Sequence, residues 1–188
     1  MYRSILLFLV LCGSIYSDAW LHEFKNLIQQ KKFSIALKKL KARFDGNNKQ
    51  LKPIENKLLS YYYFRRSLHQ RKQGRLKAAS LDMDLALAAT PGDIEIQKSR
   101  AHLYVESNQL SDAQQLIETF ITKLQGNDRR NFNLIFANLL IKQEMLFQAV
   151  QVLRNHQLEF PNHIAALVEL ARLYLKLEHY ENAADTYK

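Results

Sequence analysis

An alanine recurs five times along this chain, each time between two large apolar residues. Successive alanines lie 43, 34, 36 and 34 residues apart, at Ala36, Ala79, Ala113, Ala149 and Ala183. Three positions before them stand Phe33, Leu76, Leu110, Leu146 and Tyr180, and four positions after them stand Leu40, Met83, Ile117, Leu153 and Tyr187. A period in the mid-thirties is typical of an array of small stacked units, which usually offers a surface for binding another molecule.

The last of these units is the most regular. Residues 164–188 read IAALVELARLYLKLEHYENAADTYK, with a spaced set formed by Leu167, Leu170, Ala171, Tyr174, Ala183 and Tyr187. This pattern resembles the tetratricopeptide repeat, in which two antiparallel helices approach closely at small residues. The resemblance implies an all-α fold, a right-handed superhelix (solenoid) of tetratricopeptide-like helix-turn-helix repeats.

The resemblance divides the chain as follows. The array occupies residues 58–188, with repeats at 60–93, 94–129, 130–163 and 164–188, and the last repeat is truncated within its second helix. Gly74 and Asn108 occupy the turns between helices, since both residue types tolerate a positive φ. Residues 20–44 form a degenerate first repeat with Phe24 where a small residue is expected, and residues 45–57 are predicted to be a loop. An ordinary helical bundle with chance periodicity is the alternative.

The first nineteen residues are predicted to be a secretory signal peptide. Arg3 is followed by an apolar run from Ile5 to Leu11 and by Ser17-Asp18-Ala19, the order of a signal with cleavage after Ala19. The apolar run is too short to span a bilayer as a stable helix. The bacterial periplasm is the favoured location, with the lumen of the endoplasmic reticulum as the alternative.

Positive charge is concentrated in the first half of the chain. Residues 20–80 hold sixteen Lys and Arg against three acids, a net charge of +13, whereas residues 81–188 have a net charge of −4. Such a basic part attracts an acidic protein or an anionic lipid surface, unless it is only a solvated face. Nucleic acid is not the expected partner, because the sequence contains no nucleic-acid-binding motif.

No constellation of catalytic residues is found, and no metal or cofactor is predicted. His22-Glu23 begins like a zinc-protease helix, but Asn26 stands where the second histidine is needed. The six histidines show no pair at metal-ligand spacing, and each is interpreted as a surface or groove residue. Asp82 and Asp84 are two positions apart and face different sides of a helix.

A partner-binding groove is predicted from the aromatic run at residues 61–64. Tyr63 fits the packed stripe of its helix, so that Tyr61 and Phe64 would face a groove with basic residues beside them. The candidate residues are Tyr61, Phe64, Arg65, Leu68, Arg71, Lys72, Lys98, His102 and Asn138. The competing interpretation is that the imperfect first repeat packs against the aromatic residues.

The sequence therefore predicts an exported scaffold that mediates protein–protein interaction, with envelope assembly as its expected setting. One alternative is the repeat array of a larger secreted enzyme such as a zinc metalloprotease, and another is a binder of anionic membrane surfaces. The last helix stops without a polar cap, which predicts self-association through the final repeat.

Overall fold

The computed structural model describes residues 18–44 and 52–186, and within these ranges it contains helices and no strand. The chain divides into two compact bodies, here called the N-terminal body (residues 1–91) and the C-terminal body (residues 92–188). The predicted signal peptide lies mostly outside the described residues, as do Tyr187 and Lys188. An all-α fold is thus confirmed for the part of the chain that is described.

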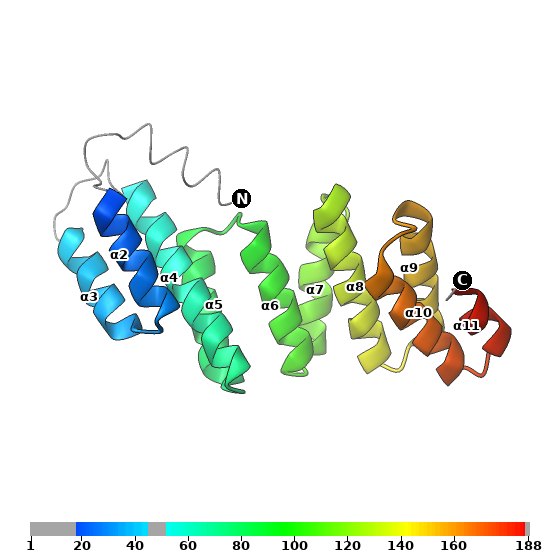
Figure 1. Cartoon of the computed structure of the whole chain (residues 1–188). Coiled ribbons are helices and arrows are strands. Elements are labelled where there is room, and N and C mark those ends of the chain that lie inside the picture. Colours follow the sequence, from blue (N-terminus) through cyan, green and yellow to red (C-terminus); the bar gives the residue numbers. More distant parts are fainter. Residues whose placement is uncertain (1–17, 45–51, 187–188) are drawn as a thin grey trace. The chain divides into compact units, whose positions relative to one another are not determined.

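The N-terminal body contains two helix pairs (Figure 1). The first pair is α2 (Asp18–Gln29) with α3 (Phe33–Arg43), and the second is α4 (Lys52–Lys72) with α5 (Leu76–Ala89). Helix α4 also contacts α2 and α3, so the first pair packs on the second. The aromatic side chain of Phe24 is fully buried and stacks on Trp20, with 5.5 Å between ring centroids. The degenerate first pair therefore fills its core with rings where the other pairs use small residues.

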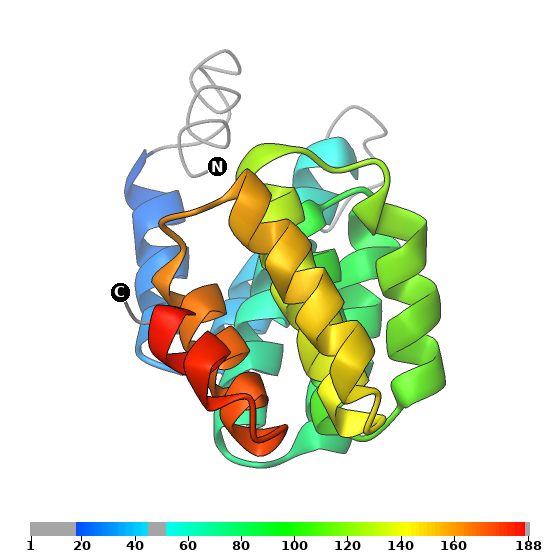
Figure 2. The ribbon, with the colours of Figure 1, turned by 90° about the vertical axis from the view of Figure 1, so that its right-hand side faces the viewer.

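The C-terminal body contains three helix pairs (Figures 1 and 2). They are α6 (Ile94–Glu106) with α7 (Leu110–Ile121), α8 (Gly126–Lys142) with α9 (Leu146–Glu159), and α10 (Ile164–Lys176) with α11 (Tyr180–Thr186). Helix α8 packs on both α6 and α7, and α10 packs on α9. Each pair therefore contacts the next one within this body.

The recurring alanine marks the point where the two helices of a pair meet. All five alanines are at most 2 % exposed, and twelve residues before four of them stands a second small buried residue. The small partners are Ser67, Ala101, Ala137 and Ala171. In the second pair the contact includes a hydrogen bond, because Ser67 Oγ donates to the carbonyl oxygen of Ala79 at 2.7 Å. Small side chains at both positions allow the close approach that the sequence predicts.

Two predicted boundaries are wrong. The predicted loop 45–57 extends too far, because α4 already begins at Lys52, and residues 45–51 lie outside the described part. Pro53 suggested a loop, but proline is well tolerated in the first turn of a helix. Likewise the predicted boundary at residue 129 falls inside α8, which begins at Gly126 and carries Asp128 in its first turn, where a negative charge is favourable.

A left-handed residue begins the turn inside every helix pair. Its φ lies between 60° and 71°, and it stands five positions before the recurring alanine, at Lys31, Gly74, Asn108, Glu144 and Glu178. Around each of these residues two backbone N–H groups bond back to the last turn of the first helix, as in Gly74 to Arg71 and Arg75 to Gln70. The predicted positive φ of Gly74 and Asn108 is confirmed.

This turn gives a prediction with a matched control. Gly74→Ala should lower the free energy of unfolding of the N-terminal body by about 1 kcal/mol, because alanine strains at a φ of +71°. Gly92→Ala should be neutral or slightly stabilising, since Gly92 does not have a positive φ and a Cβ meets no atom within 4 Å at either position. Urea unfolding followed by circular dichroism measures both changes. Equal effects of the two substitutions would contradict the role of the left-handed turn.

Candidate functional site: a basic pocket in the N-terminal body

Six of the nine predicted groove residues share one face of α4. Tyr61, Phe64 and Arg65 are followed seven residues, or two helical turns, later by Leu68, Arg71 and Lys72, which is the spacing of one helix face. Lys72 is exposed and the other five are half-buried. The structure therefore brings these six residues together, as a surface that we call the α4 face.

The other three predicted residues belong to the C-terminal body. Lys98 and His102 lie one turn apart on α6, and Asn138 lies on the neighbouring helix α8. All three are half-buried, and Lys98 forms an ion pair with Glu95 on its own helix. The predicted groove residues thus form two groups, six in one body and three in the other.

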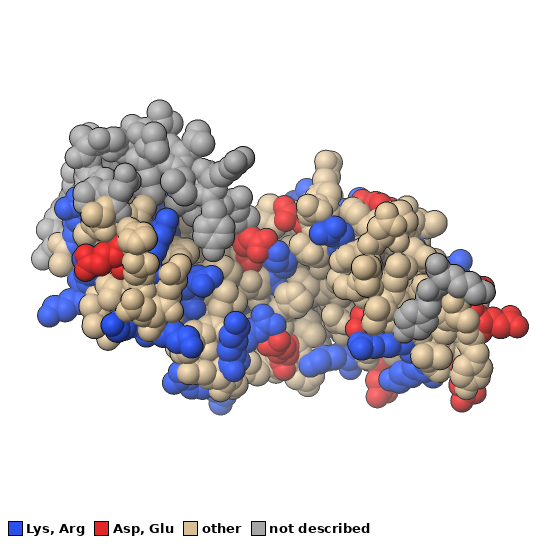
Figure 3. Space-filling view, in the orientation of Figure 1, with Lys and Arg blue, Asp and Glu red and all other residues tan. Residues whose placement is uncertain are grey.

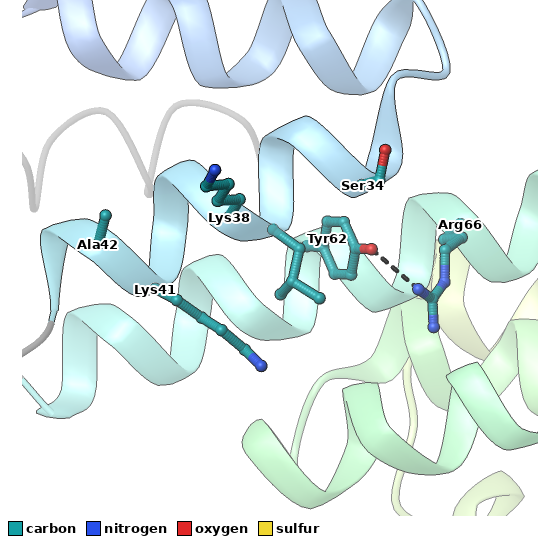
Figure 4. Close-up of a pocket in the computed structure, with 7 residues that line it drawn as sticks. Ser34, Lys38, Lys41, Ala42, Tyr62 and Arg66 are labelled. Atoms are coloured by element: carbon teal, nitrogen blue, oxygen red, sulfur yellow. Dashed lines mark hydrogen bonds between the residues drawn. The ribbon is translucent and has the colours of Figure 1, made fainter.

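A pocket opens on a different side of α4, toward α3 (Figure 4). It has a volume of about 650 Å³ and is lined by Ser34, Leu37, Lys38, Lys41, Ala42, Tyr62 and Arg66. Five of these residues come from α3 and two from α4. None of them was among the predicted groove residues, although Lys38, Lys41 and Arg66 belong to the basic residues of the segment 20–80.

The wall of the pocket is held by an ion pair between α4 and α5. Arg66 donates from Nε and Nη2 to the two carboxylate oxygens of Asp82, at 2.6 and 2.5 Å, and from Nη1 to the Tyr62 hydroxyl at 2.9 Å. Its guanidinium also lies 5.2 Å from the centre of the Tyr62 ring. Asp82 is only 2 % exposed, so its carboxylate is almost entirely removed from water. Such a bidentate ion pair fixes the orientation of the arginine.

The pKa values of two groups in this network are raised, one by a hydrogen-bonded charge and the other by burial. The Asp82 carboxylate, which accepts the arginine's hydrogen bonds, raises the pKa of Arg66 above its ordinary value. Burial is the main cause that raises the pKa of the Tyr62 phenol, and it outweighs the opposing effect of Arg66. The tyrosine therefore remains neutral and the arginine charged at any ordinary pH.

Tyr62 corrects the prediction for the aromatic run. Tyr63 was expected to be the packed residue, but Tyr62 is fully buried and Tyr63 only half-buried. The register of the repeats could have shown this, since Tyr62 stands seventeen residues before Ala79, as buried Phe132 does before Ala149. The error amounts to one residue, or about 100° around the helix.

Lys38 and Lys41 carry the free positive charge of the pocket. They lie three residues apart on α3, which places both ammonium groups on one side of the helix, and both are exposed. No acid in residues 18–44 or 52–186 forms an ion pair with either lysine, whereas neighbouring Lys39 pairs with Glu23. Among the charged side chains on the visible face of the N-terminal body, Lys and Arg predominate over Asp and Glu (Figure 3).

Two histidines meet in the C-terminal body, contrary to the interpretation of all six as surface or groove residues. His156 on α9 is fully buried, and its Nε2 lies 2.7 Å from Nδ1 of His163, the residue before α10. On its other side Nδ1 of His156 lies 3.4 Å from the amide nitrogen of Asn133. Pro161 and the turn around it bring the two rings together, although seven residues separate them in the sequence.

This histidine pair is kept neutral by its surroundings. Burial lowers the pKa of His156 to about 4, with help from His163 and from the positive charge of Arg130. Burial and Arg130 also lower the pKa of His163. No group of three or more potential metal ligands occurs in the described ranges. The pair links α9 to the residue before α10, and Asn133 of α8 lies beside it.

Comparison with solved structures gives the fold. MamA 41-end from Desulfovibrio magneticus RS-1 matches with a TM-score of 0.66 and 13 % identity, over 90 % of this chain and 89 % of that chain. Pseudomonas aeruginosa pilF matches with a TM-score of 0.59 and 14 % identity, over 90 % of this chain and 72 % of that chain. The chain has a tetratricopeptide-repeat-like fold.

The predicted solenoid class is confirmed by these neighbours. At such low identity the likeness concerns the fold alone. No family model matches the sequence, and a search of curated proteins gives no match. Within the described ranges, no helix is long and apolar enough to cross a membrane.

Proposed function

We propose that this tetratricopeptide-like chain is an exported scaffold that binds a protein partner in the bacterial periplasm, in the assembly of the cell envelope. The observation that carries this proposal is the α4 face, where aromatic and basic side chains stand half-exposed on a first helix of the array. Tyrosine and arginine are the residue types enriched where protein interfaces gain most of their binding energy. We propose no catalytic role for the repeats.

Export is supported by the sequence of residues 1–19. A basic start, an apolar run and a small-residue site precede the first tryptophan. Expressed in a Gram-negative bacterium, the protein should appear in the periplasmic fraction with Trp20 as its first residue, read by mass spectrometry. A cytoplasmic product that retains Met1 would disprove the export part of the proposal and leave the binding part to be judged separately.

The binding part can be tested with a photocrosslinking amino acid. Placed at Phe64 of the full chain, it should give a discrete adduct with a protein in living cells, because this ring lies on the α4 face. The matched control is Leu81, an exposed apolar residue on α5 that is 67 % accessible. Mass spectrometry should identify the same partner in replicate adducts from Phe64 and not from Leu81. Adducts at both positions, or with lipid instead of protein, would reject a specific protein interface at the α4 face.

A further inference from the structure

We propose that the pocket between α3 and α4 binds an acidic segment of the partner protein, with a carboxylate at Lys38 and Lys41 and an apolar side chain against the floor. This inference rests on the proposed function, because it names what the scaffold recognises. It also adds a second contact surface to the α4 face, since Tyr62 and Arg66 point to another side of α4 than Phe64 and Leu68 do.

Charge selects an anionic ligand. Among the residues that the structure describes, three cationic side chains and no acid line the pocket, and the charge of Arg66 is already balanced by Asp82. The attraction left for a ligand therefore comes from Lys38 and Lys41, which have no acidic partner among the described residues. Two lysines one helical turn apart can contact a single carboxylate or two neighbouring ones.

The uncharged part of the pocket lining favours a ligand that carries an apolar side chain beside its carboxylate. Besides Ser34, the uncharged lining consists of Leu37 and Ala42 of α3 and of Tyr62, which is itself fully buried. Ala42 and Tyr62 are labelled in Figure 4. Arg66 cannot swing away from this wall without breaking its two bonds to buried Asp82. The wall is therefore fixed before a ligand arrives, which reduces the entropy lost on binding.

The shape favours a protein segment over a membrane. A volume of about 650 Å³ lies within the range of roughly 300–1,000 Å³ found for small-ligand sites, so one or two side chains of a peptide can enter. A lipid surface is broad, and it would contact the exposed ends of the lysines without entering the concave part. An acidic peptide with apolar residues satisfies both the charge and the floor.

The test uses a defined peptide as its probe. A fluorescein-labelled peptide of alternating Glu and Leu, and a matched peptide of Gln and Leu, are titrated with the full chain at low salt, and binding is followed by fluorescence anisotropy. The Glu peptide should bind at least tenfold more tightly than the Gln peptide, and added salt should weaken its binding. Equal affinity for both peptides would overturn the proposal.

Three variants locate the binding. Lys38→Gln combined with Lys41→Gln should weaken binding of the Glu peptide about tenfold. Ala42→Phe, which fills the pocket from an exposed position and keeps every charge, should weaken it by a similar factor. Arg75→Gln combined with Lys77→Gln is the control, since it removes the same charge from exposed positions outside the pocket and outside the α4 face, and it should change affinity less than threefold. Equal losses in the pocket and control pairs, or no loss in Ala42→Phe, would show a diffuse charge effect and reject the pocket.

The remaining outcomes separate this inference from the proposed function. Flotation with vesicles of phosphatidylserine and phosphatidylcholine identifies membrane binding, and vesicle binding that depends on Lys38 and Lys41 without peptide binding would overturn the inference. If a partner is crosslinked at Phe64 and none of the three pocket substitutions reduces its capture, the scaffold proposal stands and the proposal that the pocket binds an acidic segment is rejected. If the Glu peptide binds in a way that depends on the pocket residues but no protein is crosslinked at Phe64, the pocket proposal stands and the scaffold proposal is rejected.

Discussion

Replacing Asp82 with alanine should lower the free energy of unfolding of the N-terminal body by about 3 kcal/mol, because it leaves the charge of Arg66 without its partner. The carboxylate of Asp82 is 2 % exposed and accepts two hydrogen bonds from the guanidinium, so water cannot replace it easily. Urea unfolding of the full chain, followed by circular dichroism, measures the loss. The same substitution should also loosen the wall of the α3–α4 pocket.

Two controls test the cause of this loss. Asp84→Ala removes an exposed carboxylate two positions away and should cost less than about 0.5 kcal/mol. The double variant Arg66→Met with Asp82→Leu replaces both charges by apolar groups and should recover much of the stability lost in Asp82→Ala. A double variant as unstable as the single one would show that α4 and α5 need the ion pair itself.

Stability of the C-terminal body should fall by roughly 3 kcal/mol as the pH is lowered from 6.5 to 4. Buried His156 has a pKa of about 4 in the folded chain, against an ordinary value of 6.5. Between pH 4 and 6.5 His156 is protonated in the unfolded chain and neutral in the folded chain, so lowering the pH favours unfolding. The contribution is fully present above pH 6.5 and is lost as the pH approaches 4, and the lowered pKa of His163 adds in the same direction.

Hydrogen exchange of the α9 amides gives a local measure of this effect. His156→Gln should flatten the dependence of α9 protection on pH between 4 and 6.5, because the group that titrates has been removed. His22→Gln, which changes an exposed histidine on α2, should leave that dependence unchanged. An unaltered slope in His156→Gln would assign the acid sensitivity to other groups, such as the carboxylates.

The helix pairs could be predicted from sequence because their signals are local. The small residues Ala137 and Ala149 lie twelve positions apart. This spacing can be predicted because it depends only on the helical period and on the length of the turn between the two helices. Gly74 and Asn108 could likewise be placed in turns by residue type. Glu144 and Glu178 could not, because a glutamate rarely adopts a positive φ, and only their distance from the alanine reveals the turn.

The pocket and the histidine pair could not be predicted, because they depend on contacts between pairs. Lys38 and Tyr62 line one cavity only because α3 and α4 pack at a particular distance and angle, which no single-helix pattern encodes. His156 meets His163 across the end of α9, so neither helix spacing nor a metal-ligand motif applies. The six residues of the α4 face follow one helical period, so their position on a common side of one helix follows from the sequence, while their role as a binding surface stays a prediction.

The left-handed turns have a consequence for how the chain folds and how its length can change. Each turn closes with backbone bonds that span at most five residues, and the alanine that follows meets its small partner only twelve residues back. Contacts so short in sequence form early and favour rapid folding that spreads from one hairpin to the next. A hairpin can also be duplicated or deleted as one segment, because its geometry is encoded within its own thirty-odd residues.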